Sequence, residues 1–178
     1  SKFKINNDHE EKINENISKE TFKSNVYRES PVQMITYQNG EQLAVWVDGD
    51  SDDINGITLF YSYFDGDTWS APKQVENDGT MDSAPMLVCI NDTAYLTWQN
   101  ATQKVDSKDV DKNMSLDDFC NKKKINFDIG VARFDRHTEE GTFITTTIKN
   151  DNLDMIPQIC GTSNNIYVVW VNNDQNNY

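Results

Sequence analysis

The sequence predicts an all-β protein built from a repeated unit of four short antiparallel strands. Three stretches share one order of features: an apolar-x-Asn-Asp element, a proline that opens an apolar run, and a second apolar run that ends in tryptophan. The marker pairs are Pro31 with Trp46, Pro85 with Trp98, and Pro157 with Trp170. Units of about 50 residues made of short strands are typical of β-propeller blades. The expected fold is therefore a β-propeller of four-stranded antiparallel blades, with about two and a half blades in this chain.

Length and composition agree with a folded domain. The chain has 178 residues, of which 37% are hydrophobic and 11% aromatic, so it can bury a core and is not a disordered segment. The net charge of −13 argues against nucleic acid and anionic membrane surfaces as partners. No apolar run approaches about 18 residues, so no membrane span is expected.

The first complete unit divides into four strands. Turn formers (Asn, Gly and Asp) concentrate in residues 38–41 and 64–68, and β-branched and aromatic residues fill the runs around them. The strands expected from this pattern are 32–37, 42–47, 57–63 and 69–75.

The next unit repeats this order, and a third unit is half complete. Strands are expected at 86–90, 94–98, 129–134 and 143–148, then at 158–160 and 166–171. The chain is thus expected to be one partial propeller domain over residues 1–178. Its parts are the last strand of a preceding blade (1–8), a blade (31–77), a blade with a long insertion at 99–128 (85–150), and the first half of a further blade (157–178).

Such an array is expected to need additional blades. Propellers close with about 4–8 blades, and open edge strands invite aggregation. The remaining blades are therefore expected on another chain or on a second copy of this one. The alternative is a small stack of blades that folds alone.

The long connections are expected to share one end of the blades. In an up-and-down blade, the connection after the second strand and the connection to the next blade lie at the same end. The insertions at 9–30, 48–56 and 101–127 therefore decorate one face. Loop elaboration on one face of a repeat array favours a binding face, here for a glycan or a protein, whereas drift in tolerant loops is the alternative.

Residues 27–75 carry a family resemblance. In order, they contain YRESP at 27–31, LAVW at 43–46 and SYFDGDTW at 62–69. These motifs resemble the first blade of bacterial sialidase-type propellers with Asp-boxes (BNR-like repeats). That family has an aromatic-Arg-Ile-Pro motif, a Leu-Ala-Phe-like strand and a Ser-x-Asp-x-Gly-x-Thr-Trp turn. The aspartate of the turn is displaced by one position here, and two residues instead of one separate the arginine from the proline.

The resemblance implies roles for particular residues. The Asp-box residues would be structural and not catalytic: Ser62, Asp65, Gly66, Thr68 and Trp69. Sialidase-like chemistry needs an arginine clamp for a carboxylate, an acid/base carboxylate and a Tyr–Glu nucleophile pair. The resemblance makes Arg28 the clamp residue and Asp52 or Asp53 the acid, with the nucleophile in blades outside this chain. A solvated acidic loop is the other interpretation of Asp52 and Asp53.

The acidic loop also has spacing that could bind calcium. Asp48, Asp50 and Asp52 alternate as in a Ca²⁺ loop, but Asp53 and Leu59 replace the glycine and the glutamate of an EF-hand. The sequence leaves open a weak Ca²⁺ site at these three aspartates, and no other cofactor is expected. On the loop face, Asp48, Asp50 and Arg28 are the expected ligand-binding residues.

Three functions remain in competition. The leading hypothesis is an extracellular, sialidase-like propeller fragment of a bacterium, secreted or on the cell surface. It would be non-catalytic and would bind a glycan or protein through its loop face, because the arginine set is incomplete. The alternative is an exo-sialidase-like glycoside hydrolase whose other catalytic residues lie in blades outside this chain. The third hypothesis is a purely structural assembly module.

Overall fold

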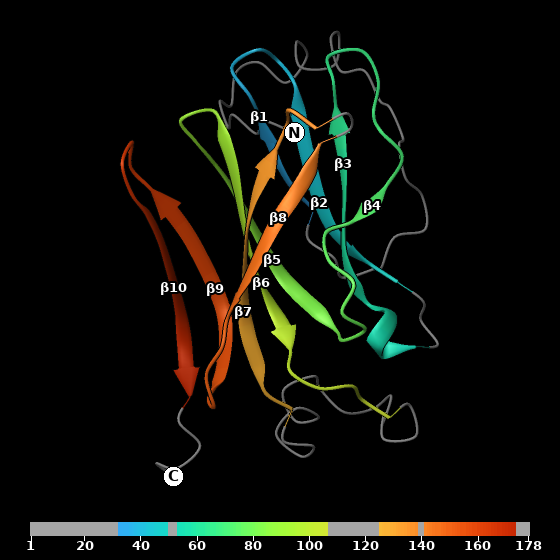
Figure 1. Ribbon diagram of the computed structural model, residues 1–178, viewed down its shortest axis with the longest axis vertical. Coiled ribbons are helices and arrows are strands. Elements are labelled where there is room, and N and C mark those ends of the chain that lie inside the picture. The colour runs from blue at the N-terminus through green and yellow to red at the C-terminus, as the bar shows by residue number, and fades with distance from the viewer. Residues whose placement is uncertain (1–31, 50–52, 107–124, 139–140, 174–178) are drawn as a thin grey trace, which may run out of the picture.

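The computed structural model describes residues 32–49, 53–106, 125–138 and 141–173, which form an all-β structure (Figure 1). Two four-stranded antiparallel sheets follow one another, in the order β1-β2-β3-β4 and β5-β6-β7-β8, and a hairpin β9-β10 comes last. The expected all-β antiparallel class is confirmed for these residues. The strands are β1 (Gln33–Thr36), β2 (Gln42–Asp48), β3 (Thr58–Phe64), β4 (Lys73–Gln74), β5 (Asp82–Ile90), β6 (Thr93–Ala101), β7 (Phe127–Asp135), β8 (Thr142–Ile148), β9 (Leu153–Gly161) and β10 (Ile166–Asn173), with a 3-10 turn η3 (Ile54–Gly56) between β2 and β3.

The fourth strand of the first sheet is shorter than expected. The sequence predicts a strand over 69–75, but β4 contains only Lys73 and Gln74, and Trp69 makes an isolated bridge to Phe64. Pro72 lies between these two pairings and has no backbone N–H to donate to the ladder. The prediction was therefore wrong in extent, although it placed the strand correctly beside β3.

Two strands begin well before their expected first residues, because a bulge accommodates a proline. The sequence predicts strands that start after Pro85 and Pro157, yet β5 begins at Asp82 and β9 at Leu153. The strand pairing shifts register at each proline, and the preceding residue takes a left-handed backbone, with φ of 50° at Ala84 and 53° at Ile156. A β-bulge of this kind bends the strand and removes one residue from the ladder. The same bend therefore recurs at equivalent positions of successive units.

The sheet β5–β8 lies between the other two layers (Figure 1). Its strand β5 packs against β1, β2 and β3, and β9 packs against β5, β6 and β7. The main core fills the space between the first two sheets. Its fully buried members include Leu43, Val45, Leu59, Leu96 and Trp98.

A second apolar cluster supports the ends of the strands near η3. Met81, Ala101, Val105, Ile125, Phe127 and Leu153 form its buried part. Ile54 and Ile57 pack against it, so the connection between β2 and β3 has its own apolar support.

The three layers form an open stack. No closed barrel or ring of sheets occurs among the residues that the structure describes. Tyr167, Val169 and Val171 of β10 are 50%, 59% and 56% exposed. In the described part of the chain, no helix has the length and apolar character of a membrane span.

Candidate functional site

The connections between strands divide the molecule into two ends (Figure 1). The loop end holds the connections from β2 to β3, β4 to β5, β6 to β7 and β8 to β9. The turn end holds the hairpin turns that follow β1, β3, β5, β7 and β9. The candidate binding residues of the acidic loop belong to the loop end, and the Asp-box-like turn belongs to the turn end.

Two of the predicted site residues of the acidic loop are described. Asp48 closes β2, is 8% exposed and accepts a hydrogen bond from the backbone N–H of Gly49 at 2.9 Å. Asp53 is exposed and caps η3 by accepting the backbone N–H of Asn55 at 3.0 Å. Arg28, Asp50 and Asp52 lie outside the described residues. Within the described ranges, no group of three or more His, Cys, Asp or Glu side chains is arranged to hold a metal ion.

Asn55 ties two loops of the loop end together. Its side-chain amide donates to the carbonyl oxygen of Val105 at 2.8 Å, and its Oδ1 accepts the N–H of Val105 at 2.7 Å. The connection after β2 is thereby fixed to the connection after β6. Sequence reasoning missed this residue, because the two partners are far apart in the chain.

A buried carboxylate joins the first two sheets. Asp82 is 3% exposed and accepts from Trp98 Nε1 at 3.0 Å and from the hydroxyl of Thr58, on the neighbouring sheet, at 2.6 Å. Burial raises the pKa of Asp82 to about 7, although both hydrogen bonds oppose the shift. A carboxyl group that titrates near neutrality is a candidate general acid, but its burial and its two protein donors give it a structural position.

The third unit holds an aspartate at the same place. Asp154 is fully buried and accepts from the side-chain amides of Asn150 and Asn172. Asp154 pairs across the strands with Asn172 as Asp82 pairs with Asn100, and each aspartate stands three residues before a proline. The pattern Asp-x-x-Pro followed by Trp-x-Asn was the sequence signal for this network. The corresponding positions of the first unit hold Arg28 and Asp48.

Exposed Asn-Asp pairs line the loop end. Asn77 and Asp78 follow β4, and Asn150 and Asp151 occupy the equivalent connection after β8, all four exposed. Burial alone would raise the pKa of Asp78, but hydrogen bonds from Thr80, and one from Asn100, lower it below its usual value. Asp78 is thus an ionised carboxylate at the surface of this end.

The Asp-box-like turn is closed by its aspartate. Asp65 Oδ1 accepts the backbone N–H groups of Thr68 at 2.8 Å and Asp67 at 2.9 Å, and these bonds lower the pKa of Asp65. Gly66 has φ of 105°, a backbone conformation that favours glycine. Ser62 donates to the carbonyl oxygen of Ser70 at 2.7 Å, and the ring of Trp69 lies 5.4 Å from that of Phe64.

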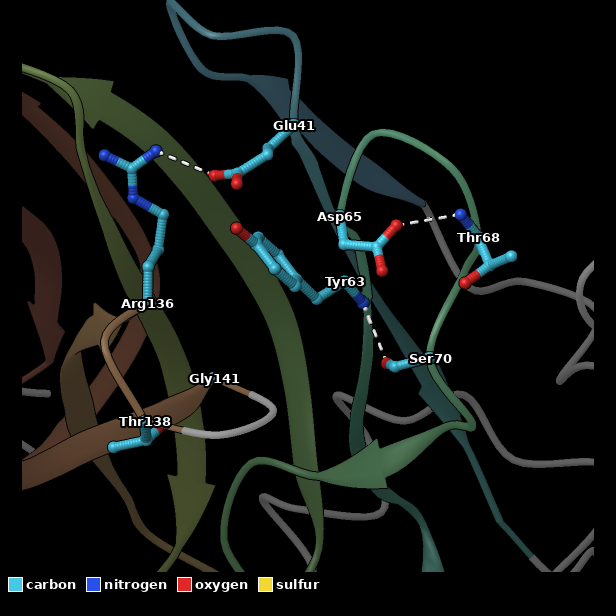
Figure 2. A pocket seen from close by; sticks show the side chains of 8 residues that line it. All are labelled: Glu41, Tyr63, Asp65, Thr68, Ser70, Arg136, Thr138 and Gly141. Carbon is cyan, nitrogen blue, oxygen red and sulfur yellow. Dashed lines mark hydrogen bonds and ion pairs between the residues drawn. The ribbon is translucent and has the colours of Figure 1, made fainter.

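A polar cavity of about 260 Å³ opens between this turn and the turn after β7 (Figure 2). Its lining residues are Glu41, Tyr63, Asp65, Thr68, Ser70, Arg136, Thr138 and Gly141. Arg136 forms ion pairs with Glu41 at 3.1 Å and Asp92 at 2.6 Å, and its guanidinium lies 4.1 Å from the centre of the Tyr37 ring. One arginine therefore connects the turns after β1, β5 and β7.

Tyr63 and Glu41 in this cavity form a tyrosine–carboxylate pair. The hydrogen bond from Tyr63 is the main cause that lowers the pKa of Glu41. Burial, and then this same bond, raises the pKa of Tyr63 above its usual value. A tyrosine nucleophile needs the opposite shift or an adjacent base that removes its proton. Tyr63 therefore acts as a hydrogen-bond donor to Glu41. Side-chain contacts across the cavity hold the first two sheets together.

No protein-family model, curated protein or solved structure matches this chain. Function is therefore inferred from the geometry of the two ends.

Replacing Arg136 with alanine is expected to lower the melting temperature by roughly 3–8 °C, because three turns lose their shared partner. Arg136→Lys keeps the charge but loses the planar guanidinium group, so a melting temperature between those of the unmodified protein and Arg136→Ala is expected. Thermal unfolding followed by circular dichroism measures both. Arg133→Ala is the control, since Arg133 is exposed and has no described partner. An equal fall in the melting temperature of the Arg133→Ala control would show that the contacts of Arg136 with the three turns contribute nothing specific.

Proposed function

We propose that this chain is part of a non-catalytic, sialidase-like β-propeller that binds a glycan or a protein through its loop end. The bacterial, secreted or cell-surface location belongs to the same proposal. Support for the repeat comes from the strand pairs β5-β6 and β9-β10, which share the bulge before a proline and a buried aspartate that pairs across the strands with an asparagine. Consecutive four-stranded sheets that stack face to face are the packing of propeller blades.

The observation that carries the binding proposal is the equivalent pair of exposed Asn-Asp sequences, at 77–78 and 150–151. Carboxylates accept hydrogen bonds, and amides both donate and accept them, so these groups suit the hydroxyls of a saccharide or the polar surface of a protein. Both pairs lie in connections that lead into β5 and β9, where the buried aspartates Asp82 and Asp154 accept hydrogen bonds from protein donors.

Two features favour binding without catalysis. The buried carboxylates of the loop end, Asp82 and Asp154, are held by fixed protein donors. Both arginines in the described ranges lie away from this end: Arg133 is within β7 and Arg136 is at the turn end. An arginine clamp from these ranges is therefore not available to a carboxylate substrate at the loop end.

The double variant Asn77→Ala/Asp151→Ala is expected to weaken binding to glycan-array or protein ligands at least about tenfold, since hydrogen bonds of two equivalent connections are lost. Titration calorimetry with a ligand identified on the array measures the change. Asp67→Ala, an exposed aspartate at the turn end, is the matched control. An unchanged affinity in the double variant, or an equal loss in the control, would refute the proposed surface.

The hydrolase alternative has its own assay. The full-length protein is expected to leave a fluorogenic sialoside intact. Turnover that disappears in a folded Arg28→Ala variant would replace the binding proposal with the glycoside hydrolase.

A further inference from the structure

An apolar groove of about 400 Å³ lies between β10 and the face of β7 and β8 that points away from the first sheet. Its apolar walls are Val131, Ile144, Ile148, Ile166 and Val168. Arg133 also lines the groove, and no described residue forms an ion pair with it. An apolar groove beside a cation that no described residue neutralises has the character of a buried interface.

The first sheet shows what covers this position in the repeat. Thr58 opposes Asp48 in the first sheet as Asp128 opposes Asn100 in the second. Counting from these pairs, Tyr61 and Tyr63 of β3 occupy the positions that Val131 and Arg133 occupy in β7.

Those tyrosines are covered by the third and fourth strands of the following sheet. The ring of Tyr61 lies 5.6 Å from Phe134 of β7 and 5.1 Å from Phe143 of β8. The ring of Tyr63 lies 5.5 Å from Phe134. Tyr61 also donates its hydroxyl to the carbonyl oxygen of Gly141 at 3.1 Å. A hairpin with two inward aromatic residues thus closes the contact between the first two sheets.

The layer that follows the second sheet has no such hairpin among the described residues. It consists of β9 and β10 alone, and β10 pairs with β9 along one edge. The other edge of β10 adjoins the groove, so its backbone groups and the groove walls face the same space. Continuation of the contact between the first two sheets would place a third and a fourth strand there.

We propose that this groove receives a β-hairpin of the same repeat type from a polypeptide segment that is not part of this sequence, and that the first strand of the hairpin pairs antiparallel with β10. The hairpin presents two aromatic or large apolar side chains, at the positions of Phe134 and Phe143, to Val131, and the first of them also contacts Arg133. This inference rests on the repeat array of the proposed function, but it involves neither the loop end nor its ligand.

The test supplies the hairpin in a form that the chain already contains. A copy of residues 126–149 is joined after Tyr178 through a flexible Gly-Ser linker, which gives it a high effective concentration. Hydrogen exchange of the β10 amides is expected to slow at least about tenfold relative to the same fusion whose copy carries Phe134→Ser and Phe143→Ser. Ile144→Asp in the groove should abolish the effect, and Met34→Asp in β1 should leave it. Ile144 and Met34 are 51% and 58% exposed, so both variants are expected to fold.

Three results would overturn the inference. The first is equal protection by the serine-containing copy. The second is full protection of β10 in the monomeric chain without any copy, which would mean that the chain covers its own groove. The third is protection that disappears on dilution of the unfused chain, which sedimentation would attribute to a second copy. Ligand binding is measured on the same fusions: failure of the hairpin with intact ligand binding refutes only this inference, and the reverse refutes only the proposed binding surface.

Discussion

Gly130→Ala is expected to lower the free energy of unfolding by about 3 kcal/mol or more. A Cβ at this position would overlap Cε2 and Cζ2 of Trp98, which is fully buried and faces Gly130 across the strands. The indole cannot move aside, because it is packed in the main core and donates to Asp82 at 3.0 Å. Urea unfolding measures the change.

A double-mutant cycle identifies the cause. Trp98→Ala alone is expected to cost about 3–5 kcal/mol, since it creates a large cavity and leaves Asp82 without one donor. In the Trp98→Ala background the overlap is absent, so adding Gly130→Ala should cost less than about 1 kcal/mol. Additive losses would show that Gly130 is required for its backbone and not for the space it leaves to the indole.

Asp82→Asn is expected to stabilise the protein at pH 8 by roughly 2–4 kcal/mol. Burial raises the pKa of Asp82 from 3.8 to about 7, so folding favours the protonated carboxyl. The contribution of this group to stability is therefore fully present below pH 3.8, declines as the pH rises, and is lost above about pH 7. Asparagine removes that decline, because it has no proton to lose.

The hydrogen bonds of Asp82 survive this substitution. Asn Oδ1 can accept from Trp98, and its amide can donate to Thr58 Oγ1. The Thr58 hydroxyl can then turn to the carbonyl oxygen of Glu76, which lies 3.2 Å away. Asp78 and Glu76 also act on the charge of Asp82 and are present in both proteins, so the difference between the two proteins isolates Asp82.

The measurement is urea unfolding of both proteins between pH 5 and pH 8. A constant difference in the free energy of unfolding between pH 5 and pH 8 would contradict the assignment of this pH dependence to Asp82. Asp154→Asn is the matched control. Asp154 accepts from two amide groups, so an asparagine there brings its own amide donor against them, and destabilisation is expected throughout the range.

The sequence was sufficient for the strands whose pattern is local. β2 and β3 were predicted within one residue at each end, because alternating apolar and β-branched residues are bounded by Asn-Gly and Asp-Gly turns. Prolines caused the errors in β4, β5 and β9. A proline normally ends or begins a strand, and the pattern carried no sign that Ala84 and Ile156 would adopt a left-handed backbone.

The contacts between the sheets could not be predicted from the sequence, because they join residues that are distant in the chain. Arg136 meets Glu41, Asp92 and Tyr37 from three different turns, and no local spacing indicates such a meeting. The buried aspartates did leave a sequence signal, since Asp82 and Asp154 each stand three residues before a proline. That signal can be interpreted only when the strand is known to begin before the proline. The sialidase resemblance stays a prediction.

The bulges at Ala84 and Ile156 have a consequence for how such a chain can change over generations. A slip of one residue in a strand ordinarily exchanges its inward and outward side chains. A bulge ends one register and starts another, so the segment of β5 before Ala84 is aligned independently of the segment after it. An insertion or deletion at the loop end can then be absorbed before the bulge, while Leu87 and Cys89 keep their places against the core. Ligand preference and core architecture can therefore evolve separately within a single strand.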